Sequence, residues 1–96
     1  MLGTTVYFNI KPGREADFEA AARDMIDGVR ANEPGAIFYS LFKSQRDGEY
    51  VFMERWADQA ALDAHMAGPP HVAAIADRFM DCVIGDPNMT TYEMVE

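Results

Sequence analysis

Two neighbouring segments of the chain are apolar on both of their alternating faces, and this feature limits the fold most. In residues 36–43 and 49–56, apolar side chains occupy odd and even positions alike. A strand of this kind needs cover on both sides of its sheet. Asp47-Gly48 lies between the two segments and is typical of a hairpin turn. The segments are therefore predicted to pair as adjacent antiparallel strands in the interior of an assembly.

The rest of the chain supplies two further strands and three helices. Alternating apolar residues predict strands over 5–10 and 89–95, and spacings of three and four predict helices over 14–32, 59–67 and 71–83. Apart from the extra short helix, the order is β-α-β-β-α-β, which is typical of the ferredoxin-like α+β fold. We expect one domain over residues 1–96, with a four-stranded antiparallel sheet and helices on one face.

The helices of such a fold leave the second face of the sheet open. A chain of 96 residues that is 49% hydrophobic and has Cys82 as its one cysteine cannot form an intrachain disulfide. Small domains without disulfides or metals are often stabilised by a partner subunit. The two-sided apolar strands therefore predict a homodimer in which two sheets pack face to face.

The charge balance disfavours several classes of partner. The chain has 8 basic and 16 acidic side chains, for a net charge of −8, and its basic residues are scattered. Such a surface repels nucleic-acid phosphates and anionic lipids. No apolar stretch approaches the ~20 residues of a membrane span, and Met1 to Thr5 lack the basic start of a signal peptide. A cytoplasmic location is expected.

Several motifs along the chain resemble one known family. They are the stretches 11–18 (KPGREADF), 32–35 (NEPG) and 54–66 (ERWADQAALDAHM), followed by His71. Over about residues 4–95 the chain resembles the antibiotic biosynthesis monooxygenase (ABM) domain family, and within it the small quinol-monooxygenase-like members. The most specific part is E-x-W-x-D-x-x-A-L-x-x-H, with a second histidine six residues later.

The resemblance implies a fold, a partner and an activity. It implies a dimeric α+β barrel, with a pocket between helices and sheet in each subunit. It further implies a cofactor-independent monooxygenase that oxidises a small quinol-like or phenolic aromatic substrate with O₂, without metal, flavin or haem. In that chemistry the deprotonated substrate supplies the electrons, so the protein needs only to bind it, promote loss of its proton and hold the anion.

Two histidines are the candidate catalytic residues. His65 borders the buried face of its short helix near the C-terminal end, and it is a candidate general base or hydrogen-bond donor. His71 opens the last helix, where the helix dipole favours the neutral imidazole. As alternatives, His65 is a helix-end residue bonded to backbone carbonyls, and His71 is an exposed or capping residue.

Five other residues are candidates for substrate contact, each with a structural alternative. Trp56 and Tyr39 are aromatic strand residues that either reach the substrate or pack in the core and at interfaces. Val6 and Phe8 share the strand face expected to point at the helices, and Ile75 lies on the apolar stripe of the last helix. We expect Glu54, on the same strand face as Trp56, to have a structural ion pair or capping contact.

Other functions remain as alternatives. The same two histidines would serve an isomerase or lyase acting on a small carbonyl compound, and the fold also suits a non-catalytic small-molecule-binding module. A haem-degrading branch of the wider family uses an Asn, a Trp and an axial His. Alignment puts Val6, His65 and Ile75 at these three positions, which argues against haem degradation.

Overall fold

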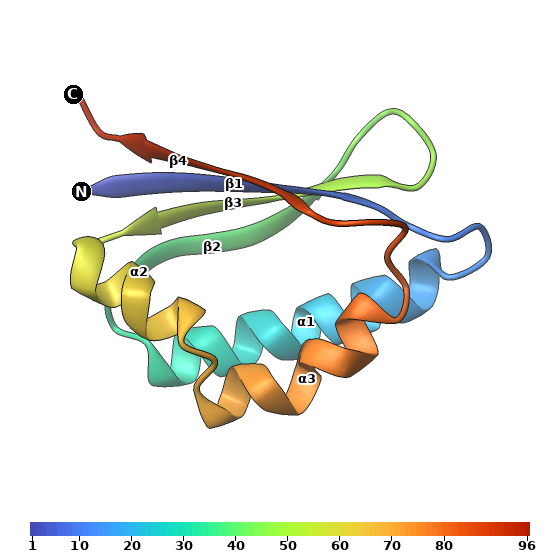
Figure 1. Ribbon diagram of the computed structural model, residues 1–96, viewed down its shortest axis with the longest axis horizontal. Helices are drawn as coiled ribbons and strands as arrows, with labels where there is room; N and C mark the ends of the chain where they lie inside the picture. The colour runs from blue at the N-terminus through green and yellow to red at the C-terminus, as the bar shows by residue number, and fades with distance from the viewer.

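The computed structural model describes residues 1–96 and contains four strands and three helices. The strands form one antiparallel sheet in the order β2-β3-β1-β4. All three helices lie on the same side of this sheet (Figure 1). The arrangement confirms the predicted ferredoxin-like α+β fold. In chain order the elements are β1 (Leu2–Asn9), α1 (Glu15–Asn32), β2 (Ala36–Lys43), β3 (Glu49–Trp56), α2 (Gln59–Met66), α3 (Pro70–Met80) and β4 (Asn88–Glu93).

The element boundaries differ most from the sequence prediction in three elements: β1, α3 and β4. Strand β1 begins at Leu2 rather than residue 5, because its first residues pair with both β3 and β4. Helix α3 ends at Met80 rather than residue 83, since Val83 forms an isolated bridge with Ile10. Strand β4 spans 88–93 rather than 89–95. Backbone pairing between segments far apart in the chain determines where these elements begin and end. The periodicity of apolar residues along the chain carries no information about such pairing.

The strand register determines which side chains face the helices. Val6 of β1 lies opposite Phe52 of β3, and Thr4 lies opposite Glu54. Tyr39 of β2 pairs with Glu54 from the other side. These residues are on the helix-facing side of the sheet, so the Glu54 carboxyl is held between two neighbouring strands beneath the helices.

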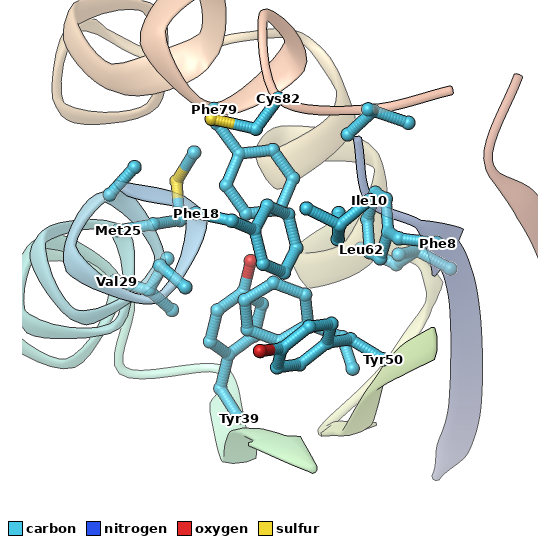
Figure 2. Close-up of a cluster of buried hydrophobic side chains, with 14 of the residues drawn as sticks. Phe8, Ile10, Phe18, Met25, Val29, Tyr39, Tyr50, Leu62, Phe79 and Cys82 are labelled. Atoms are coloured by element: carbon cyan, nitrogen blue, oxygen red, sulfur yellow. The ribbon is translucent and has the colours of Figure 1, made fainter. Parts of the chain in front are cut away.

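Phe18 is at the centre of the hydrophobic core. Its ring is completely buried, and its centroid lies 4.6 Å from that of Phe79, 5.0 Å from that of Tyr50 and 5.5 Å from that of Phe8. Figure 2 shows Phe18 of α1 meeting Phe79 of α3, with the Tyr50 ring beneath Phe18. The core therefore joins both long helices to the two central strands.

The face of the sheet opposite the helices carries large apolar side chains that nothing covers. Figure 1 shows no helix of the chain on this side. Between 40% and 53% of each of five large residues on this face is exposed: Tyr7, Phe38, Phe42, Met53 and Tyr92. We call these five residues the outer-face cluster. None of the three helices is both long enough and apolar enough to cross a membrane.

Candidate functional site

A cavity of about 370 Å³ lies between the sheet and the helices. Its volume suits one small organic ligand. Most of its wall is apolar, and the polar groups in it come from Tyr39, Glu54 and His65. The other lining residues are Val6, Phe8, Met25, Phe52, Met66, Ala76, Phe79, Met80, Pro87 and Met89.

Glu33 connects the two histidines of the sequence motif. Its carboxylate oxygens lie 3.1 and 3.0 Å from His65 Nδ1, and Oε2 lies 2.5 Å from His71 Nε2. The three side chains are 10% to 17% exposed. One buried carboxylate thus orients two imidazole rings that come from different helices.

The Glu33 contacts determine which nitrogen of His65 is free. An ionised carboxylate only accepts hydrogen bonds, so it favours the tautomer in which Nδ1 carries the hydrogen. His65 Nε2 then holds a lone pair. This nitrogen has no protein partner and is not fully buried, and the ring that carries it lines the cavity. The arrangement gives the cavity a potential general base whose orientation is fixed from behind.

A glycine beside Glu33 allows this cluster to form. A Cβ on Gly35, two residues after Glu33, would lie 2.5 Å from the Cβ of Ala61 in α2. A Cβ on Gly28 of α1 would meet the Cβ of His71 at 3.4 Å. Only glycine at position 35 therefore lets the turn after α1 approach α2, whereas a Cβ on Gly28 would make an ordinary contact with His71.

The N-terminus of α2 is fixed by its own cap. Asp58 accepts a hydrogen bond of 2.8 Å from the backbone N–H of Ala61. Such caps stabilise a helix by about 1 kcal/mol. The cap sets the start of the eight-residue helix α2, and through it the place of His65 near the other end.

Glu54 is a buried carboxyl with no cation as partner. It is 6% exposed, and its Oε1 accepts a hydrogen bond of 3.1 Å from Trp56 Nε1. Burial, together with the negative charge of Glu33, raises the pKa of Glu54 to about 7, although the indole N–H opposes the shift. Burial, followed by the charges of Glu54 and Glu33, also raises the pKa of Tyr39, so its hydroxyl stays protonated at neutral pH.

The predicted site residues divide into two groups. Val6, Phe8, Tyr39 and His65 line the cavity. His71, Trp56 and Ile75 lie outside its wall. His71 bonds to Glu33, and Trp56 is completely buried with its ring 4.9 Å from the His65 ring. Ile75 packs against the core, while Ala76, Phe79 and Met80 are the residues of α3 that reach the cavity.

Sequence reasoning missed the roles of two acidic residues. Glu33 lies in the stretch 32–35 quoted above, but it was not among the candidate site residues. Glu54 was expected to have an ion pair or a capping contact, but its hydrogen-bond partner is the indole of Trp56. Both glutamates lie inside the motifs quoted above, and this position was the sequence signal that could have identified them as site residues. No group of three or more His, Cys, Asp or Glu side chains is arranged to hold a metal ion.

Comparisons with known proteins agree with this architecture. A curated protein from Synechocystis, the uncharacterized protein sll1783, is 28% identical over 88 residues. The match covers 91% of this chain, which spans 58% of that relative's length. A solved antibiotic biosynthesis monooxygenase is 30% identical, with a TM-score of 0.89 and full coverage of both chains.

A third comparison concerns the fold. SnoaB from Streptomyces nogalater, described as a cofactor-independent oxygenase, superposes with a TM-score of 0.85 at 19% identity. The match covers 99% of this chain and 93% of that one. The family model for antibiotic biosynthesis monooxygenases matches residues 1–77 of this sequence. With most of its length matched by that model, the chain belongs to the antibiotic biosynthesis monooxygenase (ABM) family.

Proposed function

We propose that this protein is a monooxygenase that oxidises a small phenolic or quinol-like aromatic compound with O₂, using His65 as general base. One observation carries the proposal. His65 presents an unpartnered Nε2 at the polar end of an otherwise apolar cavity, while Glu33 holds its Nδ1. An apolar cavity suits a flat aromatic ring, and a fixed imidazole suits the removal of a hydroxyl proton.

The reaction can be written with the substrate as the only reductant. His65 accepts the hydroxyl proton, and the resulting phenolate gives one electron to O₂. The phenoxyl radical and superoxide then combine at a ring carbon, and protonation gives a hydroperoxide. Cleavage of its O–O bond leaves one oxygen on the ring as a quinone carbonyl. The other oxygen leaves as water, with the hydrogens of the hydroxyl and of the ring C–H.

The second histidine has a supporting role in this scheme. His71 does not line the cavity but bonds to the same Glu33 carboxylate as His65. When His65 takes up a proton, the Glu33 carboxylate compensates the positive charge of the imidazolium. Glu33 and His71 are therefore positioning residues, and Val6, Phe8 and Tyr39 are the proposed substrate contacts. The description of SnoaB as a cofactor-independent oxygenase supports the same kind of chemistry on this fold.

Oxygen uptake tests the proposal directly. The purified protein, with no cofactor added, is mixed with a panel of hydroquinones, naphthols and anthrones in an oxygen-electrode cell. We expect catalysed O₂ consumption with at least one compound, and mass spectrometry with ¹⁸O₂ should find one labelled oxygen in the product. Hydrogen peroxide without label in the product would indicate an oxidase. Turnover of a carbonyl compound under argon would indicate an isomerase or lyase, and either result would overturn the proposal.

We also propose that the protein works as a homodimer joined through the outer-face cluster. These apolar side chains lie on the side of the sheet that the chain leaves bare. Burying them against a second copy would remove a surface that otherwise favours association with other molecules. Two sheets facing each other would give the dimeric barrel that the sequence led us to expect.

Sedimentation equilibrium checks this prediction at micromolar concentration. We expect twice the monomer mass of 10.7 kDa. Met53→Lys, on a central strand of the outer face, should shift the mass to that of a monomer. Met66→Lys, on α2 at the opposite side of the sheet, is the matched control and should stay dimeric. A wild-type protein that sediments as a monomer would contradict the prediction.

A further inference from the structure

Glu54 is a buried titratable group that the scheme above leaves unused. An isolated carboxylate in an apolar environment is unfavourable unless it is paired. No salt bridge involves Glu54, and its neighbour Arg55 is exposed on the other face of the strand. A leucine would cost the fold less at this position. The presence of a carboxyl group at this position therefore indicates a role other than stabilising the fold.

The two carboxyl oxygens of Glu54 have different surroundings. Oε1 accepts the hydrogen bond from Trp56 Nε1. Oε2 has no protein partner. It is not fully buried, and the residue that carries it lines the cavity. The indole N–H occupies the accepting oxygen, so a proton on Glu54 belongs on Oε2. A neutral Glu54 would thus point an O–H donor at whatever fills the cavity.

The charged and titratable groups around Glu54 favour that neutral form. Glu33, at the end of α1, adds negative potential, and Tyr39 on β2 is itself uncharged. His65 on α2 is committed to Glu33. Arg30 of α1 bonds to the backbone oxygen of Tyr39 and to Ser40 instead of Glu54. The pKa of Glu54 near 7 agrees with this arrangement.

We propose that Glu54, as the neutral carboxylic acid, donates a hydrogen bond to the carbonyl or phenolate oxygen of a ligand bound beside His65. An ionised Glu54 would repel the anion that His65 generates, whereas the acid form stabilises it, as protonated carboxyls do at other oxyanion sites. The ligand class is an aromatic ketone, quinone or phenolate. The inference rests on the proposed function for the identity of the cavity as the substrate site, and it makes Glu54 a substrate-binding residue.

Binding of 1-indanone, compared with indane, tests this proposal without any oxygenation. Indanone offers one carbonyl acceptor, and indane has the same ring system without the oxygen. Trp56 is the only tryptophan, so a single indole N–H signal in ¹⁵N NMR spectra reports events next to Glu54. We expect indanone to bind about tenfold more weakly at pH 8.5 than at pH 6, since one buried hydrogen bond is lost. Indane should bind equally at both pH values.

Three variants assign the pH response to its residue. Glu54→Gln keeps an N–H donor and should hold the pH 6 affinity for indanone up to pH 8.5. At every pH, Glu54→Leu should bind indanone about tenfold more weakly than the wild type does at pH 6. Its apolar side chain favours folding. His65→Gln should keep the wild-type pH response, which separates Glu54 from its titratable neighbour.

The results that would overturn the proposal are equally specific. A wild-type affinity for indanone that is flat from pH 6 to 8.5 would do so, and so would a pH response that survives in Glu54→Gln. These outcomes concern binding alone. A protein that consumes no oxygen with any phenol, yet binds indanone as described, would instead count against the proposed function.

Discussion

Replacing His65 with alanine is expected to lower kcat for oxygenation by about 10²–10⁴-fold, the usual contribution of a positioned general base. The variant removes the nitrogen that faces the cavity and leaves Glu33 bonded to His71 alone. Because the apolar wall remains, KM should change much less than kcat. Steady-state O₂ uptake with the best substrate of the panel measures both parameters.

Glu33→Gln is the companion variant for this experiment. A glutamine side chain has nearly the shape of glutamate, but it carries no charge, and an NH₂ donor replaces one of the two accepting oxygens. We expect a smaller loss of kcat than for His65→Ala, with KM close to wild type. Wild-type kcat in His65→Ala would contradict the assignment of the base, provided that the variant shows an ordinary thermal transition.

Phe18→Ala should lower the free energy of unfolding by about 3–5 kcal/mol, which is the cost of truncating a large buried aromatic residue. The ring is completely buried and contacts aromatic rings from β1, β3 and α3. A domain of this size has a total stability of only about 5–15 kcal/mol. Much of the variant should therefore be unfolded in mild urea.

Equilibrium urea denaturation followed by circular dichroism measures this loss. Phe18→Leu is the matched control, because it keeps most of the volume and should cost less than about 1.5 kcal/mol. Both variants should be compared at one protein concentration, since an association equilibrium adds to apparent stability. A cost below about 1 kcal/mol for Phe18→Ala would mean that the ring is not the centre of the core.

The sequence was sufficient for the fold because each element carries its own local signal. Turn residues separate the strands, and the apolar spacing of α1 identifies the helix face that is buried in the structure. The ends of β1 and α3 were displaced because they depend on pairing partners far along the chain, such as Val83 with Ile10. No local pattern encodes such a partner.

The candidate site was predictable only in part, for a related reason. His65 stood out because histidine is uncommon in this chain and belongs to a recognisable motif. Glu33 lies 32 residues before His65 and 38 before His71, and only the folded chain brings these side chains together. Likewise, the sequence alone does not show that Glu54 is buried, because its burial depends on the strand register that places it between β1 and β2 beneath the helices.

The exposed methionines of the cavity wall differ in mechanical properties from the cluster that holds His65. Met66, Met80 and Met89 are each at least 37% exposed, and their unbranched thioether chains adjust at little energetic cost. Behind His65, a Cβ on Gly35 would clash with Ala61, so the turn that carries Glu33 is held close against α2. Changes in ligand size are thus absorbed by these methionines, while the glutamate–histidine cluster keeps its geometry. A directed-evolution library aimed at bulkier ligands would therefore place its diversity at these three methionines and leave the glutamate–histidine cluster untouched.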